Sequence, residues 1–223
     1  MGYKRAMAND TGLERLVFFS DAVVAIAITL LVLEIKLPPL PEEATEAALR
    51  AALGHTLPHV LAYVSTFLLI GILWIGHHVK FRSVQHYDGK LLWLNLFFLM
   101  GVGFLPFTSG LSAEHHGPTA WQLHTGTLAF TSAASLALWA YALKAGLVDP
   151  ALPADARRRG LVNTALIVGV FVLSGALSCV SMTLAHNAMW LALAPALFGR
   201  VKRAAELPPE PLTALAPEPV EPG

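Results

Sequence analysis

The sequence is poor in charged residues, which make up 13% of its 223 positions, whereas hydrophobic residues make up 55%. A soluble domain usually contains about a quarter charged residues, so this composition favours a membrane protein. The formal net charge is zero, so there is no excess of basic residues to favour nucleic-acid binding. The composition therefore predicts an all-α, polytopic membrane protein.

Cysteine is nearly absent, since the chain has only Cys179, and one cysteine forms no disulfide within the chain. The nine histidines do not form the His-Glu-x-x-His pattern of zinc proteases. His55 and His59 have the i, i+4 spacing that can chelate a metal, but Pro58 lies between them. We expect no cofactor, no metal held by the protein and no enzymatic activity.

Long apolar runs are abundant, and a spanning helix needs about 20 apolar residues. We place six transmembrane helices at 15–36, 57–80, 90–111, 119–144, 160–184 and 186–201. The alanine-rich segment from Glu42 to Leu53 could extend the second helix beyond the membrane. Residues 204–223 repeat proline, glutamate and alanine, a composition that does not bury a core. We therefore expect a transmembrane domain over 1–203 and a disordered cytoplasmic tail over 204–223.

Basic residues gather at both ends of the chain and in alternate connections between the helices. They are Lys4, Arg5, Arg15, Lys80, Arg82, Lys90, Lys144, Arg157, Arg158, Arg159, Arg200, Lys202 and Arg203. The remaining connections contain only Lys36 and Arg50 as basic residues. Because cytoplasmic loops are enriched in lysine and arginine, we expect a multi-pass protein of the cytoplasmic membrane. Both termini would lie in the cytoplasm, which requires an even number of spans.

The first apolar run contains polar residues near both of its ends. Arg15, Ser20 and Asp21 lie near its start, and Glu34 lies near its end. Ionisable groups in a membrane helix are costly unless they find partners or line a water-filled path. Candidate partners lie near the predicted cytoplasmic ends of the second and third helices. We expect one polar cluster of Arg15, Ser20, Asp21, His77, Trp93 and Asn95.

A stripe of aliphatic residues runs along the same helix. At about 100° per residue, Ile26, Leu30 and Leu33 fall within about 60° of one another, and Thr29 lies beside Ile26. Asp21 points about 140° away from Ile26, so satisfying the polar cluster would aim the stripe away from the subunit core. Such a stripe usually packs on lipid or on neighbouring helices, so apolarity alone does not indicate a pore.

The run Arg15-x-x-x-Phe19-Ser20-Asp21 resembles the signature of the endosomal and lysosomal potassium channel family, in its prokaryotic branch. The following AIAITLLVLEI, Trp74-x-x-His77 in the second helix, and LLWLNL followed by LPF in the third also resemble that family. The resemblance is close over about residues 14–110. Elsewhere it extends only to the hydrophobic layout.

This resemblance implies a six-helix subunit, four of which assemble as a homotetramer around a pore lined by the first helix. Ile26 would form the first hydrophobic constriction, Leu30 and Leu33 the next layers, and Thr29 would match a hydroxyl position implicated in potassium preference. The family lacks a carbonyl-lined filter, and no TVGYG-like run occurs in this sequence. A polar network within each subunit is also implied, consisting of Arg15, Phe19, Ser20, Asp21, His77, Trp93 and Asn95.

The sequence hypothesis is a potassium-permeable cation channel. Rings of aliphatic side chains gate by dewetting, and potassium holds water less tightly than sodium, so the expected selectivity is modest. Three alternatives remain open. Asp21 and His77 could form a proton relay in a proton channel or secondary transporter, the paired histidines could serve an intramembrane metalloenzyme, and the protein could be a non-conducting structural one. Glu34 could concentrate cations at the pore mouth or simply be a solvated helix end.

Overall fold

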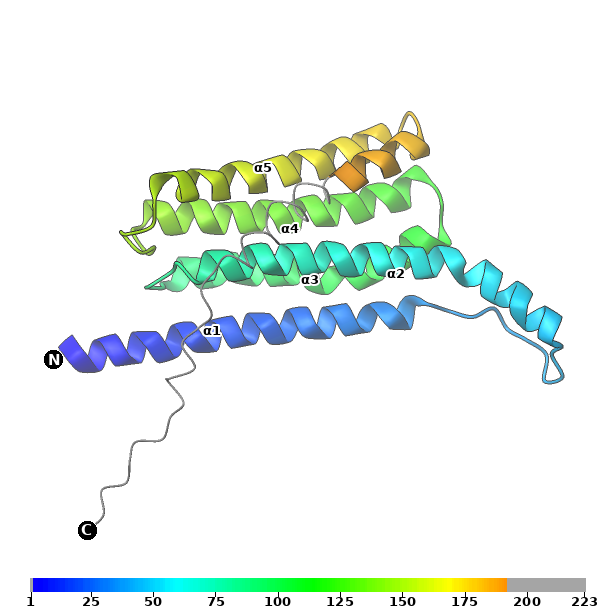
Figure 1. The fold of residues 1–223 in the computed structure, drawn as a ribbon, viewed down its shortest axis with the longest axis horizontal. Helices are drawn as coiled ribbons and strands as arrows, with labels where there is room; N and C mark the ends of the chain where they lie inside the picture. The colour runs from blue at the N-terminus through cyan, green and yellow to red at the C-terminus, as the bar shows by residue number, and fades with distance from the viewer. Residues whose placement is uncertain (1, 192–223) are drawn as a thin grey trace, which may run out of the picture.

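The computed structural model describes residues 2–191, which form long helices lying side by side (Figure 1). In chain order these are α1 (Gly2–Leu30), the 3-10 helix η1 (Leu31–Glu34), α2 (Glu46–Phe81), α3 (Gly89–Glu114), α4 (Pro118–Lys144) and α5 (Ala154–Leu177). A further helix begins at residue 182 and continues to residue 191. Within residues 2–191, five helical segments, the first being Thr11–Glu34, are long and apolar enough to cross a membrane. The all-α, multi-pass prediction is confirmed.

Three helices begin earlier than the expected spans: α1 at Gly2 instead of 15, α2 at Glu46 instead of 57 and α5 at Ala154 instead of 160. Two of the runs also end differently. The first run ends as a 3-10 turn at Glu34 instead of an α-helix to residue 36. α5 ends at Leu177 instead of 184, because a turn at residues 178–180 interrupts the run. In this turn the Ser178 hydroxyl donates to the Gly175 carbonyl at 2.6 Å. Gly175 and Ser178 lie in an otherwise apolar run, so the apolar pattern alone did not locate the turn. Most of the expected span 186–201, and the tail 204–223, lie outside the described residues.

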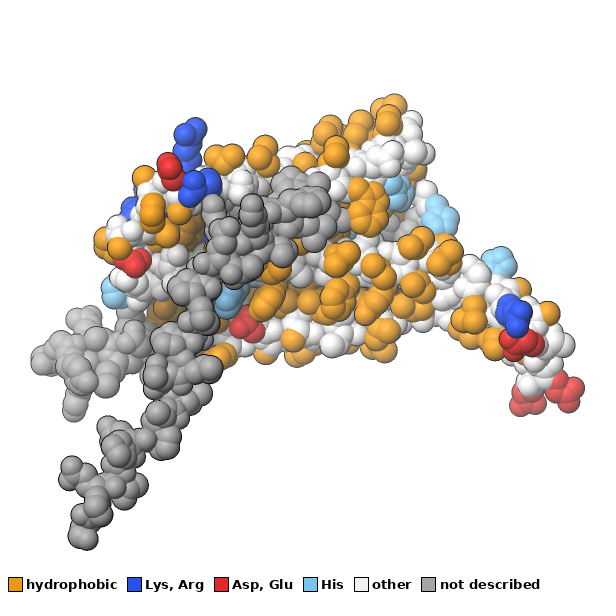
Figure 2. Space-filling model, viewed as in Figure 1, with side chains coloured by type: hydrophobic (Ala, Val, Ile, Leu, Met, Phe, Trp, Pro, Cys, Tyr) orange, Lys and Arg blue, Asp and Glu red, His pale blue; other side chains and the backbone are white. Residues whose placement is uncertain are grey.

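α3 and α4 occupy the middle of the bundle, with α1 along one edge and α5 along the other (Figure 1). Phe98 and Val102 of α3 and Leu128 of α4 are completely buried. Gly101 permits close approach of the two helices, because a Cβ at this position would lie 2.2 Å from the Thr131 hydroxyl oxygen. Hydrophobic side chains cover the middle of the visible face, and most charged side chains lie towards its ends (Figure 2). This distribution fits a bilayer around the bundle.

Two of the loops rich in basic residues meet at one end of the bundle. The Gln85 amide donates to the Leu147 carbonyl, and the Asp149 amide donates to the Ser83 carbonyl, each at 2.8 Å. Asp88 caps α3 by accepting from the Leu91 amide at 2.9 Å. The first two bonds hold the α2–α3 loop beside the α4–α5 loop.

Replacing Asp88 with alanine should lower the thermal midpoint of the purified protein by a few degrees. Asp88 accepts from the Tyr141 hydroxyl as well as from the Leu91 amide, so alanine removes the helix cap and a link to α4. Loss of a cap costs about 1 kcal/mol, which is ~2–4 °C for a chain of this size.

Asp88→Asn is the control, because asparagine keeps the capping oxygen. The hydrogen bond from Tyr141, followed by that from Leu91, lowers the pKa of Asp88 from its usual value. The charge therefore stabilises the fold above the unfolded-state pKa, and this contribution is lost as pH falls through the depressed value. The midpoint difference between wild type and Asp88→Asn should shrink on acidification, and an Asp88→Ala midpoint equal to wild type would contradict the assignment.

Candidate functional site

One face of α1 and η1 is fixed against the bundle. Leu16, Ser20, Val24, Ala27 and Leu31 are buried, and they follow one another at intervals of four, four, three and four residues. This spacing places them on one side of a helix. The rotation of α1 about its own axis is therefore set by this face.

A chain of buried hydrogen bonds links this face to α2 and α3. The Ser20 hydroxyl donates to the Leu16 carbonyl at 2.8 Å, and Asn95 Nδ2 donates to the same hydroxyl at 2.8 Å. His77 Nε2 lies 2.8 Å from Asn95 Oδ1. Because an amide oxygen only accepts, His77 Nε2 is the donor. Ser20, His77 and Asn95 are each at most 2% exposed, so the chain joins three helices in a dry environment.

The His77 ring is held between two aromatic rings. Its centroid lies 4.3 Å from that of Phe81 and 4.8 Å from that of Phe98. Both stacks leave the ring little freedom to turn, so Nε2 is aimed at Asn95. His77 therefore acts as a fixed donor in the core of the bundle.

Asp21 pairs with a residue outside the expected cluster. Its carboxylate accepts from Trp74 Nε1 at 2.7 Å, whereas His77 bonds to Asn95. Consecutive helical residues point about 100° apart, so when Ser20 faces the core Asp21 lies to one side. From the sequence, Trp74 was identified only as part of the Trp74-x-x-His77 motif. Residues at i and i+3 lie on the same side of a helix, so this spacing indicated that Trp74, like His77, could face α1.

The other expected members of the network lie outside it in the single subunit. Trp93 is 64% exposed, because it lies two residues from Asn95 and so points about 200° away on α3. Arg15 and Phe19 are also exposed, on a different side of α1 from Ser20. The structure thus brings together Ser20, Asn95 and His77, with Asp21 paired separately.

The aliphatic stripe lies on a face of α1 that the described part of the subunit leaves uncovered. Ile26 is 59% exposed, Leu30 is 42% exposed and Leu33 is 68% exposed. Thr29 is exposed beside them, and its hydroxyl donates to the Ile26 carbonyl at 2.8 Å. Leu33 belongs to η1, whose turns are tighter than those of an α-helix. The stripe is therefore straight through Leu30 and changes direction at Leu33.

The last turn of this segment is anchored to α3. Glu34 packs against Gly110, where a Cβ would lie 2.2 Å from the carboxylate oxygen. Two residues later, Lys36 Nζ lies 3.0 Å from Glu114 Oε1, and this hydrogen bond raises the pKa of Lys36. Among the side chains that the structure describes, those of residues 11–191, no three of histidine, cysteine or acidic type are arranged to hold a metal ion.

Known proteins share both the sequence pattern and the fold. Residues 15–106 match the family described as "Endosomal/lysosomal potassium channel TMEM175". A Streptomyces collinus protein named as a potassium channel is 36% identical over 164 residues, which cover 71% of this chain and 77% of that protein. A zebrafish protein named as an endosomal/lysosomal proton channel is 34% identical over 110 residues, which cover 49% of this chain but only 21% of that protein.

A solved structure is similar to most of the chain. It is a crystal structure from Chamaesiphon minutus, described as a lysosomal potassium-selective channel TMEM175 homolog. The similarity has a TM-score of 0.75 at 27% identity and covers 85% of this chain and 98% of that one.

Proposed function

The chain belongs to the endosomal/lysosomal potassium channel family, and from this premise we propose that it is a potassium-permeable channel whose pore is lined by α1 of four identical subunits. The subunits would lie in the cytoplasmic membrane. Both termini would face the cytoplasm, since the basic loops gather at one end of the bundle.

The observation that carries this proposal is the orientation of α1. The chain of hydrogen bonds from His77 through Asn95 to Ser20 holds one side of the helix in the bundle. The side bearing Ile26 and Leu30 is left uncovered at the edge of the subunit. A helix fixed in this way can present the same residues to a common axis in every copy.

Ion passage would then depend on rings of aliphatic side chains. Four copies of Ile26 would form a narrow apolar constriction, followed by Leu30 and Leu33 towards the outer end. Such a constriction is permeable when water fills it and closed when it dries. An ion passing it must deform its hydration shell, and potassium does so at lower cost than sodium. Modest selectivity for potassium is the expected consequence, with Thr29 as the polar group beside the first ring.

The proton-relay alternative has weaker geometric support. Asp21 bonds to Trp74, while His77 bonds to Asn95 between two phenylalanine rings. The two titratable side chains are thus engaged by different partners. We therefore favour conduction along the apolar face of α1 over proton transfer through the subunit core.

Flux measurements on purified protein in liposomes test the proposed function. We expect a reversal potential that follows the potassium gradient, responds less to sodium, and changes little with pH at a fixed potassium gradient. A potential that follows pH but not potassium would support the proton alternative. Absence of ion flux above that of protein-free liposomes would support a non-conducting role.

A further inference from the structure

α2 is longer than a bilayer requires. Its 36 residues give about 54 Å of helix at 1.5 Å per residue, against a hydrocarbon thickness of about 30 Å. His59 and Ala62 of α2 border the same small cavity as Glu34, the charged end of η1. The outer membrane boundary therefore lies near His59. Residues 46–58, here called the outer extension, project beyond it, and Figure 1 shows this part of α2 passing the end of α1.

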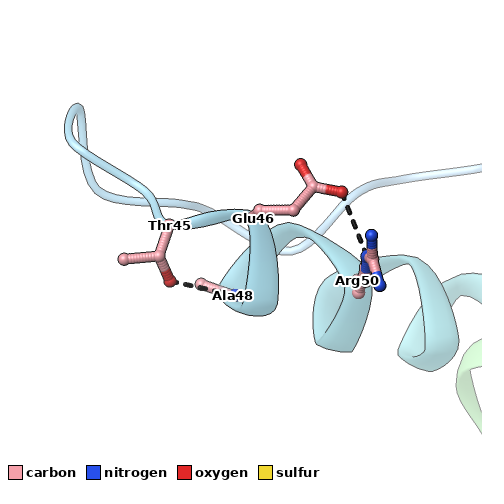
Figure 3. Close-up of polar contacts among 4 residues, drawn as sticks. All are labelled: Thr45, Glu46, Ala48 and Arg50. Atoms are coloured by element: carbon pink, nitrogen blue, oxygen red, sulfur yellow. Dashed lines mark hydrogen bonds and ion pairs between the residues drawn. The ribbon is translucent and has the colours of Figure 1, made fainter.

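The outer extension is a well-specified helix. The Thr45 hydroxyl accepts from the Ala48 amide at 3.2 Å, and Arg50 Nε lies 3.0 Å from Glu46 Oε1 (Figure 3). Such a cap gives a hydrogen-bond partner to a free amide of the first turn, and the negative charge of Glu46 interacts favourably with the positive end of the helix dipole. Pro58 lacks an amide hydrogen and so removes one backbone hydrogen bond of the helix. The helix bends and leans towards the α1 side of the subunit (Figure 1).

An apolar stripe begins on the extension and continues along α2 past His59, and the described residues leave it uncovered. Leu53 and Leu57 are each 55% exposed, Val60 is 36% exposed and Val64 is 44% exposed. Their spacing of four, three and four residues is that of a coiled-coil seam. On the adjoining face Ala52 and Thr56 are buried. One face of the extension is therefore packed within the subunit, whereas the face that bears the stripe is exposed.

Lipid is a poor partner for this stripe. Leu53 and Leu57 lie beyond the hydrocarbon boundary near His59, so acyl chains do not reach them. Helices that rest on a membrane surface are rich in lysine and arginine, whereas this segment and the turn before it carry Glu42, Glu43 and Glu46 against a single Arg50. The charge pattern therefore favours a protein partner over a lipid surface.

We propose that Leu53 and Leu57 of the outer extension pack against the outer extension of a neighbouring copy of this chain, above the outer mouth of the pore. This inference rests on the proposed function, because α1 faces a common axis only in an assembly, and the extension leans to the α1 side. The contact would fix the outer ends of the subunits to one another. Within each subunit, the Lys36–Glu114 pair already ties the segment that follows η1 to α3.

Cysteine crosslinking tests this contact. In a Cys179→Ser background, Leu53→Cys and Leu57→Cys are compared with Ala51→Cys and His55→Cys, which are exposed on the same extension but point about 200° away. Full-length protein in liposomes is treated with copper phenanthroline or a short bismaleimide. We expect a species of twice the monomer mass for the first pair and monomer for the controls.

Monomer at all four positions, or equal crosslinking at all four, would overturn the proposal. Protection of Leu53→Cys and Leu57→Cys from a water-soluble maleimide without crosslinking would overturn it in favour of the membrane surface. Potassium flux is recorded on the same liposomes. Flux without crosslinks refutes the contact and leaves the channel proposal standing, whereas crosslinks without flux refute the channel proposal and support the contact.

Discussion

Replacing Ile26 with asparagine is expected to raise potassium flux about tenfold and to bring the permeabilities of potassium and sodium closer together. Ile26 is more than half exposed and makes little contact within its own subunit, so the substitution should leave folding intact. The carboxamide holds water, and a hydrated ring no longer closes by drying. A barrier lower by about 1.4 kcal/mol corresponds to the tenfold change. Flux and reversal potentials in liposomes measure both effects.

The matched control is Leu166→Asn on α5, at the other edge of the subunit. Leu166 is 61% exposed and Ile26 is 59% exposed, so the two substitutions place the same polar group at equally uncovered positions. Only the first position is proposed to face the pore. Equal effects of the two substitutions, or no effect of either, would show that Ile26 is a lipid-facing residue.

The sequence was sufficient to predict the elements formed by long, uniform patterns. The apolar runs predicted the five membrane-length helices that the described residues contain, and the alanine-rich segment after Glu42 indicated the early start of α2 at Glu46. The end of α5 was missed, because Ser174, Gly175 and Ser178 lie inside a longer apolar run, where small residues are as typical of tight helix packing as of a turn. Hydrophobicity specifies burial in a membrane, but it does not specify where a helix ends.

The polar site was predictable as a group of residues and not as a set of bonds. Ser20, His77 and Asn95 lie together, as their positions near one end of three helices suggested. Asp21 follows Ser20 on the helix, so its side chain points about 100° away from that of Ser20. The residue types alone do not show which neighbouring helix lies in that direction. The role of the aliphatic stripe also does not follow from a single chain. Ile26 and Leu166 are exposed to a similar extent in one subunit, and only the positions of the other subunits would distinguish a pore-facing residue from a lipid-facing one.

Replacing Asn95 with leucine is expected to destabilise the protein and to disturb the alignment of α1. Leucine has the same number of side-chain heavy atoms and the same branching as asparagine, but it leaves the His77 Nε2–H without an acceptor in a site that is 2% exposed. An unpaired buried donor costs about 1–3 kcal/mol. The thermal midpoint of the detergent-solubilised protein should fall by several degrees, whereas Trp93→Leu, at an exposed position on the same helix, should change it little.

Combining Asn95→Leu with His77→Phe separates two effects of the His77–Asn95 hydrogen bond: its contribution to stability and its contribution to the alignment of α1. Phenylalanine keeps the stack between Phe81 and Phe98, and replacing both partners by apolar groups removes the unpaired donor. The double variant should regain most of the lost midpoint, since Ser20 still donates to Leu16. Its link from α3 to α1 remains absent, so its potassium-to-sodium permeability ratio should stay below that of wild type. Recovery of both stability and selectivity would show that hydrophobic packing alone orients α1, and additive losses in stability would show that His77 and Asn95 act independently.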